Sequence, residues 1–331
     1  MRFKKSIIIH QGALGDLINT LPAIQALKEN SQTLFAIGSE RLKLLKYAGI
    51  IDQLFSPHSV NFHLLFMEDF LPSPALKKIF DQAEVVISWL GKHSKTYEQN
   101  LKSLAGIVKI FREEFPPRNA KEQFSRILSK PVEELGIEIP SYLPRLILPR
   151  ADSLPFLREL ESPFYLVFHP GAGSEKKRLS REKTIQLINL LAEEFSELAL
   201  VVILGEAEKS LGFDLTCQLS EKTKSKIKLI QSYDLIWLAQ ILNNAEIYLG
   251  MDSGPTHLAS ALGTKTVAIF ISSNPKIWAP RHPWAKIISV QYPCAPCSDE
   301  QRRTCSDYPC VQAIDEFLII QEIKNLLNLE F

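Results

Sequence analysis

The sequence of 331 residues lacks long hydrophobic runs and any marked excess of one charge sign. No segment approaches the roughly 18 consecutive apolar residues of a membrane-spanning helix. The basic start MRFKKSIII carries too short an apolar stretch for a secretory signal. The formal net charge of +1 argues against a nucleic-acid-binding protein with a dominant basic face. We therefore expect a cytoplasmic protein that binds no nucleic acid.

Internal repeats and low-complexity tracts are also absent from the sequence. Its 46% hydrophobic and 23% charged residues are those of an ordinary globular protein. Because a chain of this length is long for one core, we expect two domains. Residues 1–150 contain 20 Lys and Arg against 15 Asp and Glu, whereas the remainder contains 18 against 22. The basic first half suits an anionic acceptor or a membrane headgroup surface, or is simply an unevenly charged solvated surface.

Strand-like apolar runs alternate with helix-like segments along the chain. The runs lie at residues 6–10, 33–38, 84–90, 164–169, 198–205, 227–231, 245–250 and 265–271. Residues 183–196 carry apolar side chains at near-helical spacing. Continuous apolar strands separated by helices are typical of parallel sheets covered on both faces, so the sequence predicts an α/β protein.

Four of the 20 prolines are concentrated in residues 143–164. Because proline enforces extended backbone and interrupts helices, we place an interdomain linker near residues 145–162. The predicted domains are residues 1–150 and 151–312. The last segment, residues 313–331, has apolar positions at helical spacing and should bury one face against the body of the protein.

Three loops that follow predicted strands carry unusual residues, and parallel α/β sheets bind ligands beyond the carboxyl ends of their strands. The first loop places Gly12, Gly15 and Asp16 between a strand and a helix. Taken alone, Asp16 is most simply a helix cap, because aspartate is a preferred capping residue. A catalytic base would suit the same position.

The second loop, HPGAGSEKKRLS at residues 169–180, combines two glycines with Lys176, Lys177 and Arg178. Glycine lets backbone N–H groups approach a ligand closely. The segment matches neither the mononucleotide nor the dinucleotide phosphate-binding pattern. By itself, this loop is more simply a solvated basic turn.

The third loop, GMDSGPTHLASALG at residues 250–263, carries the signals of a helix start. Asp252 or Ser253 can cap the helix, and Pro255 fits its first turn. Such a start presents free N–H groups and a partial positive charge, which favour an anion. His257 lies near the same turn, where a structural role is the usual one for a lone histidine.

Together, the three loops resemble the motifs of glycosyltransferase family 9, the ADP-heptose:lipopolysaccharide heptosyltransferases. GALGDLINTLPAIQALK resembles the Leu-Gly-Asp motif, FHPGAGSEKKRLS the His-Pro-Gly motif with its lysine, and GMDSGPTHLASALGTKTVAIF the Asp-Ser-Gly-Pro-x-His-Leu-Ala motif. The resemblance implies a GT-B architecture: α/β, with two Rossmann-like domains facing across a cleft. It also implies that the C-terminal helix, residues 313–331, returns to the first domain.

Under this resemblance, residues 1–150 bind the acceptor and residues 151–312 bind the nucleotide sugar. Asp16 would be the general base, with Gly15 and Asn19 on the acceptor side, and Lys177 would be the second catalytic residue. The implied donor site comprises Gly171, Gly173, Ser174, Lys177, Glu208, Asp252, Ser253, Gly254, Pro255 and His257.

The implied function is inverting transfer of heptose from ADP-heptose to a hydroxyl of an anionic lipopolysaccharide inner-core acceptor, with no cofactor required for catalysis. The alternatives are another nucleotide sugar, a protein acceptor, or a catalytically silent nucleotide-sugar-binding subunit. Asn19, Leu179 and Ile271 stand where many members have histidine, tryptophan and glycine, which leaves the sugar and the acceptor open. The implied location is the cytoplasm, either free or peripheral at the inner face of the inner membrane.

Four of the five cysteines form a C-x2-C-x7-C-x4-C cluster: Cys294, Cys297, Cys305 and Cys310. A C-x-x-C pair with two further thiols can bind a Zn or Fe ion tetrahedrally. Cytoplasmic disulfides are disfavoured. A structural Zn or Fe ion, free thiols and a disulfide are the alternatives here. An ion at this cluster would brace a loop and take no part in catalysis.

Overall fold

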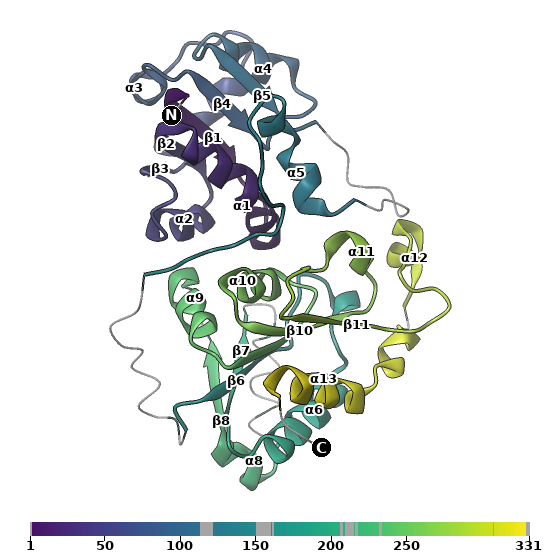
Figure 1. Cartoon of the computed structure of the whole chain (residues 1–331). Helices are drawn as coiled ribbons and strands as arrows, with labels where there is room; N and C mark the ends of the chain where they lie inside the picture. The colour runs from purple at the N-terminus through teal and green to yellow at the C-terminus, as the bar shows by residue number, and fades with distance from the viewer. Residues whose placement is uncertain are drawn as a thin grey trace. The chain divides into compact units, whose positions relative to one another are not determined.

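The chain divides into two compact units, residues 1–149 and 150–331, each built around its own parallel sheet (Figure 1). The computed structural model describes residues 2–112, 122–149, 160, 162–205, 208, 215, 218–231, 234–306 and 308–328. Most of the linker expected near residues 145–162 lies outside these described residues. No helix within them is both long and apolar enough to cross a membrane.

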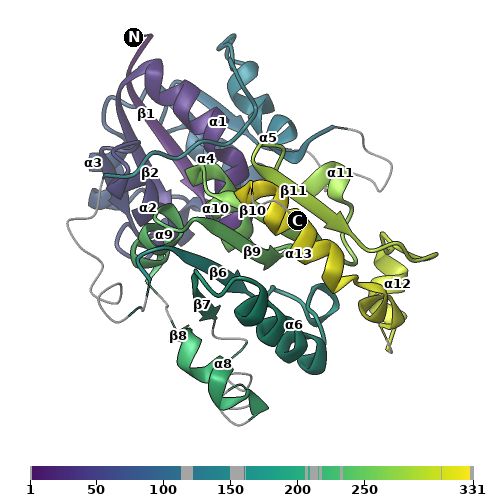
Figure 2. The same ribbon diagram turned by 60° about the horizontal axis from the view of Figure 1, so that its bottom comes forward.

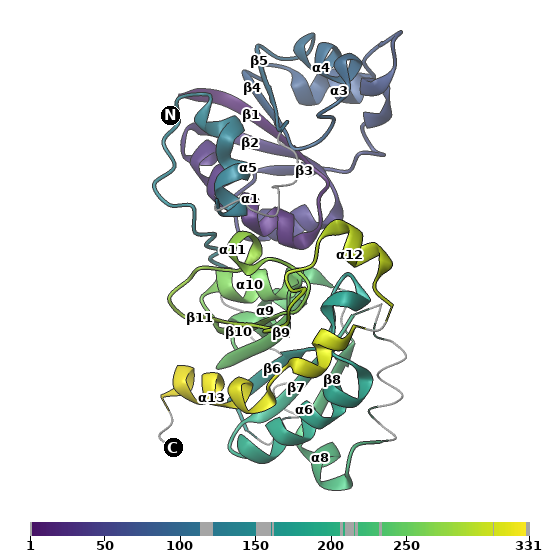
Figure 3. The same ribbon diagram turned by 90° about the vertical axis from the view of Figure 1, so that its right-hand side faces the viewer.

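The first unit is a five-stranded parallel sheet of order β3-β2-β1-β4-β5. Helices α1 and α5 lie side by side on one face, and α3 and α4 cover the other (Figure 3). The strands are β1 (Phe3–His10), β2 (Ser31–Gly38), β3 (Gln53–Phe55), β4 (Val85–Ser88) and β5 (Ile107–Ile110). The helices are α1 (Leu14–Glu29), η1 (Glu40–Leu42), α2 (Lys43–Tyr47), η2 (Phe62–Phe66), α3 (Pro74–Phe80), α4 (Lys95–Lys102) and α5 (Phe124–Glu133).

Strand β1 is the centre of the first unit. Its residues Ile7, Ile8 and Ile9 are fully buried, as expected of a strand covered on both faces. The chain passes from β1 to β2 on one side, whereas β4 pairs with β1 on the other. The carboxyl ends of β1 and β4 therefore form the topological switch point, where open α/β sheets bind ligands.

The second unit is a six-stranded parallel sheet of order β11-β10-β9-β6-β7-β8. Its switch point lies between β6 and β9. The strands are β6 (Tyr165–His169), β7 (Ala199–Leu204), β8 (Ile227–Gln231), β9 (Ile247–Met251), β10 (Lys265–Phe270) and β11 (Ala285–Ser289). The helices are η4 (Glu175–Lys177), α6 (Arg181–Glu194), α8 (Glu221–Lys226), α9 (Leu235–Asn243), α10 (Gly254–Leu262), α11 (Pro275–Trp278), α12 (Asp299–Thr304), η6 (Pro309–Ala313) and α13 (Glu316–Leu327).

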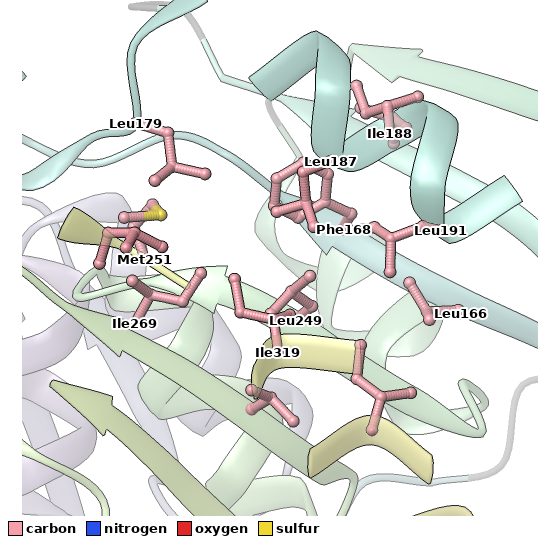
Figure 4. Close-up of a cluster of buried hydrophobic side chains, with 14 of the residues drawn as sticks. Leu166, Phe168, Leu179, Leu187, Ile188, Leu191, Leu249, Met251, Ile269 and Ile319 are labelled. Carbon is pink, nitrogen blue, oxygen red and sulfur yellow. The ribbon is translucent and has the colours of Figure 1, made fainter. Parts of the chain in front are cut away.

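Helix α13 packs within the second unit, and its return to the first domain stays a prediction. It contacts α6, β10 and β11. In Figure 4, Ile319 of α13 points into the same apolar cluster as Leu249 of β9. Three side chains of the helix belong to this core: Ile319, Ile320 and Ile323. The apolar face of α13 is thus already covered by the second sheet.

Lys183 of α6 fixes the start of α13, which runs beside α6 in Figure 2. Its Nζ donates a hydrogen bond of 3.1 Å to the carbonyl oxygen of Ile314. The same ammonium group lies 2.6 Å from Oε1 of Glu316 in an ion pair. Because a buried ammonium needs such partners, Lys183 ties the C-terminal segment to the second unit.

Candidate active site

Asp16 lies in the first turn of α1, directly beyond the carboxyl end of β1. Its Oδ2 accepts a hydrogen bond of 3.0 Å from the backbone N–H of Ala13, the N-cap residue. Asp16 is therefore the third helical residue and supports the cap from inside the helix. A carboxylate at this position also interacts favourably with the helix dipole.

Asp16 lines a cavity of about 280 Å³ in the first unit. The cavity opens at the carboxyl ends of β1, β4 and β5, and its exposed lining is mainly apolar. We call it the first-unit cavity, and its lining residues are His10, Gly12, Asp16, Trp89, Leu90, Gly91, Lys92, Phe111, Phe124 and Leu128.

Gly15 and Asn19, predicted on the acceptor side, contact each other within α1. The Asn19 side-chain amide donates a hydrogen bond of 2.8 Å to the carbonyl oxygen of Gly15. Asn19 is buried in the helix. This contact explains an amide at position 19 locally, and an acceptor-side role for the two residues stays a prediction.

In the second unit, the loops after β6, β7, β9 and β10 meet, because these four strands are neighbours in the sheet. Asp252, which directly follows β9, is the centre of a polar cluster that we call the donor network: Lys177, Asp252, His257 and Ser273. Lys177 Nζ lies 2.7 Å from Asp252 Oδ2, and the Ser273 hydroxyl donates to the same oxygen. His257 Nε2 lies 3.8 Å from Asp252 Oδ1.

The electrostatics of the donor network keep Asp252 ionised. Burial alone would raise the pKa of this carboxyl group, since only 5% of the residue is exposed. The neighbouring His257 ring and the charge of Lys177 outweigh burial and lower the pKa well below its ordinary value. Asp252 is thus a permanent carboxylate that fixes Lys177.

Helix α10 begins beside this network, with Ser253 as its N-cap, as the sequence predicts. The Ser253 side chain makes no cap hydrogen bond. Its Oγ instead lies 3.2 Å from Thr256 Oγ1 and 3.5 Å from His169 Nδ1. Gly254 and Pro255 form the first turn, so the partial positive charge of the helix lies next to Lys177.

Glu208, after β7, joins a second group of predicted donor residues. Its Oε2 accepts a hydrogen bond of 3.1 Å from the Gly205 N–H, and Arg178 Nη1 lies 3.4 Å from its Oε1. A Cβ atom at Gly171 would lie 2.5 Å from Glu208 Oε2, so the carboxylate requires glycine there. By contrast, Gly173 and Ser174 are exposed, and a Cβ atom at Gly173 would contact nothing within 4 Å.

Sequence reasoning assigned no role to Ser273, His169 or His10. Ser273 contacts Asp252, and His169 lies beside Ser253. Burial lowers the pKa of His169 to about 4, so its ring is neutral at neutral pH. Each of the three lies at or just beyond the carboxyl end of a strand, and that position alone would have marked them as candidates.

The four clustered cysteines form no disulfide in the structure: Cys294, Cys297, Cys305 and Cys310. Burial raises the pKa of Cys310, and the other three thiols raise it further, so the four are electrostatic neighbours. Within the described ranges, no three His, Cys, Asp or Glu side chains are arranged to hold a metal ion.

Residues 73–306 match the family described as "Glycosyltransferase family 9 (heptosyltransferase)". In sequence, the chain is 28% identical over 130 residues to lipooligosaccharide heptosyltransferase 2 of Campylobacter jejuni serotype O:2. That match covers 38% of this chain and 39% of the relative. Such matches with curated relatives span less than two thirds of those proteins, from 39% to 57% of their length.

Two solved structures share the fold over nearly all of both chains. A glycosyltransferase family 9 protein from Veillonella parvula is 16% identical with a TM-score of 0.76, and the match covers 100% of this chain and 99% of that one. The ADP-heptose LPS heptosyltransferase II of E. coli is 14% identical with a TM-score of 0.71, covering 98% of each chain. They identify the two parallel α/β units as a GT-B fold. With its family match extending over most of the sequence, the chain belongs to glycosyltransferase family 9.

Proposed function

We propose that this chain is an inverting glycosyltransferase that moves heptose from ADP-heptose to a hydroxyl of a lipopolysaccharide inner-core acceptor. The donor network carries the proposal, because a buried carboxylate that fixes Lys177 beside the start of α10 suits a diphosphate. The names of two relatives support the choice of donor. The Campylobacter jejuni protein and the E. coli protein are both called heptosyltransferases, and the name of the E. coli protein specifies ADP-heptose.

In this proposal the second unit binds the donor. Lys177 and the first-turn N–H groups of α10 contact the diphosphate, and Arg178 adds a second cation. Glu208 accepts hydrogen bonds from the ribose hydroxyls, as acidic residues after a strand do in dinucleotide-binding sheets. The remaining predicted donor residues shape the loops that follow β6 and β9: Gly171, Gly173, Ser174, Asp252, Ser253, Gly254, Pro255 and His257.

The first unit binds the acceptor, and Asp16 takes the proton from the attacking hydroxyl. The new bond joins the acceptor oxygen to the anomeric carbon while the bond from that carbon to the phosphate oxygen breaks. The bonding electron pair leaves with ADP, so a single displacement inverts the anomeric centre. Negative charge grows on the diphosphate as the sugar becomes oxocarbenium-like, and Lys177 with the start of α10 stabilises it.

The proposed reaction requires no cofactor, and no step passes through the cysteine cluster. A structural Zn or Fe ion at Cys294, Cys297, Cys305 and Cys310 is a separate proposal, which rests on their spacing and shared neighbourhood. Elemental analysis of protein purified without added metal tests it. A near-stoichiometric Zn or Fe content supports the ion, and less than about a tenth of an equivalent favours free thiols or a disulfide.

We further propose that the protein works in the cytoplasm, peripherally at the inner face of the inner membrane. The support is the basic balance of residues 1–150, with 20 Lys and Arg against 15 Asp and Glu, which suits an anionic glycolipid. Sedimentation with anionic and with neutral vesicles tests this. The expected result is that the protein sediments with anionic vesicles alone and that salt weakens this binding. Sedimentation with neither kind of vesicle, or equally with both, would contradict the proposal.

A thermal-shift screen of ADP-, UDP- and GDP-sugars tests the donor, because a ligand that binds the folded form stabilises it. ADP-heptose should give the largest shift and should be consumed when a deacylated inner-core saccharide is added. A larger shift with a UDP-sugar would remove the heptosyl assignment. A shift with ADP-heptose but no transfer to any acceptor would favour the silent-subunit alternative.

A further inference from the structure

His10, the last residue of β1, is a buried polar side chain with only 2% of its surface exposed. Burial lowers the pKa of its imidazole to about 4, and the charge of Arg41 contributes to the same shift. The ring is therefore neutral at neutral pH. A neutral imidazole has one N–H donor and one lone-pair acceptor, and both require partners when they are buried.

The hydrogen bonds around Thr20 assign the two ring nitrogens of His10. The Thr20 hydroxyl donates its hydrogen to the carbonyl oxygen of Asp16 at 2.7 Å. It can therefore only accept from His10 Nε2, which lies 3.5 Å away. Nε2 thus carries the N–H and Nδ1 carries the lone pair. Nδ1 is buried and has no hydrogen-bond partner among the described residues.

His10 and Asp16 both line the first-unit cavity. Both side chains lie against Gly12, where the absence of a Cβ atom leaves room for them. A Cβ atom at Gly12 would lie 2.9 Å from His10 Cε1, the carbon between the two ring nitrogens, and 3.1 Å from Asp16 Oδ2. The imidazole of His10 and the carboxylate of Asp16 thus border the same space, and a ligand with neighbouring hydroxyl groups could donate to both side chains.

Trp89 supplies an apolar wall to the same cavity. Its ring centroid lies 6.0 Å from that of His10, and its Nε1 donates a hydrogen bond of 3.0 Å to the carbonyl oxygen of Leu128. This bond fixes the indole and satisfies its polar atom, which leaves the apolar ring surface to line the cavity. Apolar walls with a few converging polar atoms are typical of small-molecule sites, and a sugar ring has both kinds of surface.

We infer that the first-unit cavity binds the acceptor sugar ring that carries the attacking hydroxyl. The C–H face of the ring packs against Trp89, and a hydroxyl next to the attacking one donates a hydrogen bond to His10 Nδ1. The inference rests on the proposed function and specifies how its acceptor is held. His10 orients the ring so that the attacking hydroxyl faces Asp16, and Asp16 alone takes the proton.

Two variants of His10 separate this role from a structural one. In His10→Asn, the amide oxygen can occupy the position of Nδ1, whereas in His10→Gln the amide reaches the position of Nε2 next to Thr20. We expect His10→Asn to keep the KM for a deacylated inner-core saccharide within about threefold, and His10→Gln to raise it roughly tenfold, as for one lost hydrogen bond. The KM for ADP-heptose should stay unchanged in both. If His10 acted only through its hydrogen bond to Thr20, His10→Asn would instead have the higher KM for the saccharide.

Calorimetric titration of the saccharide in the presence of ADP gives a readout that needs no turnover. We expect the dissociation constant of the saccharide to stay near the wild-type value in His10→Asn and to rise in His10→Gln. Trp89→Leu should weaken binding as well. The inference would be overturned if His10→Gln kept the wild-type KM and Kd for the saccharide, or if His10→Asn weakened binding more than His10→Gln did. The proposed function would still stand in that case, provided that the wild type transfers the sugar. Saccharide binding without transfer would leave the subsite and remove the proposed function. If His10→Gln fails to fold, Trp89→Leu and His10→Asn decide the question.

Discussion

The backbone N–H of Ala13 donates a 3.0 Å hydrogen bond to Asp16, whose carboxylate therefore closes the first turn of α1 and borders the first-unit cavity at once. Either position would by itself explain an acidic residue. The two roles separate in Asp16→Asn, because an amide oxygen still accepts from Ala13 but a neutral amide cannot take up a proton.

Asp16→Asn should slow sugar transfer by roughly 10²–10⁴-fold, the usual contribution of a general base. Its melting temperature and its ADP binding should match those of the wild type, because the cap is retained and the proposed donor residues lie on the other unit. Single-turnover transfer, a melting curve and an ADP titration check the three statements. Transfer near the wild-type rate would remove the assignment of Asp16 as the base.

Lys177→Ala should raise the KM for the donor by roughly ten- to a hundredfold, since it deletes a charge-assisted contact to the diphosphate. Lys176→Ala is the matched control, because Lys176 belongs to the same turn and lies over the Tyr308 ring at 5.3 Å. We expect little change in donor kinetics for the control. If Lys177→Ala behaves normally instead, the diphosphate contact belongs to Lys176 or Arg178.

Turnover should survive EDTA, because the proposed mechanism assigns the diphosphate charge to Lys177 and the start of α10 rather than to a metal ion. The measurement is the transfer rate after prolonged chelation, with and without added Mg²⁺. Loss of activity on chelation and its recovery with Mg²⁺ would show that a metal ion holds the diphosphate, and the assignment of Lys177 would then be wrong.

Both units should lose stability as the pH falls from about 6.5 to about 4, because His10 and His169 have pKa values near 4 in the fold and ordinary values when unfolded. In this window the unfolded chain binds protons that the folded chain does not, so the free energy of unfolding decreases with decreasing pH. Each histidine contributes up to about 3 kcal/mol. Replacing the exposed His58 by Gln should leave the pH dependence unchanged.

Urea unfolding at about pH 7 and about pH 4.5 measures this effect. His10→Asn should flatten the dependence for the first unit, and His169→Asn should do so for the second. A dependence that stays equally steep in both variants would mean that other groups control acid stability.

Ile319→Ala should destabilise the second unit by roughly 2–5 kcal/mol, because it leaves a cavity where a fully buried side chain packs against the sheet. Phe317→Ala on the same helix is the control, since Phe317 is 79% exposed and its loss should change stability by no more than about 0.5 kcal/mol. Equal effects of the two changes would contradict the packing of α13 on the second unit.

The strand predictions show which part of the fold is readable from sequence. All eight predicted strands are confirmed, with ends shifted by at most three residues. The sequence missed β3, β5 and β11, and each of these lies at the edge of its sheet. Edge strands are covered on fewer sides and need no continuous apolar run. The segment QLF at residues 53–55 therefore lacks the long apolar run that marks a fully buried strand.

The site was predictable where it follows the ends of strands and less so where it depends on packing. Asp16 and Asp252 could be identified because each stands where a strand is followed by a helix. The position of Ser273 marks it as a candidate too, but its contact with Asp252 could not be predicted, because that contact depends on β10 lying beside β9. The contact of α13 with the second sheet could not be predicted either, since the apolar spacing of the helix shows that a face is buried without showing which sheet covers it.

The position of α13 also bears on the order in which the two units can be completed during synthesis. The buried cluster of the first unit contains Ile7 at one extreme and Tyr97 and Leu101 at the other, so its members leave the ribosome early. The cluster of the second unit includes Ile319 and Ile323, which are translated after every residue of the first cluster. A nascent chain can thus complete the first cluster before α13 has been synthesised, whereas the second cluster must wait for that helix. Loss of α13 would remove side chains from the second cluster and none from the first.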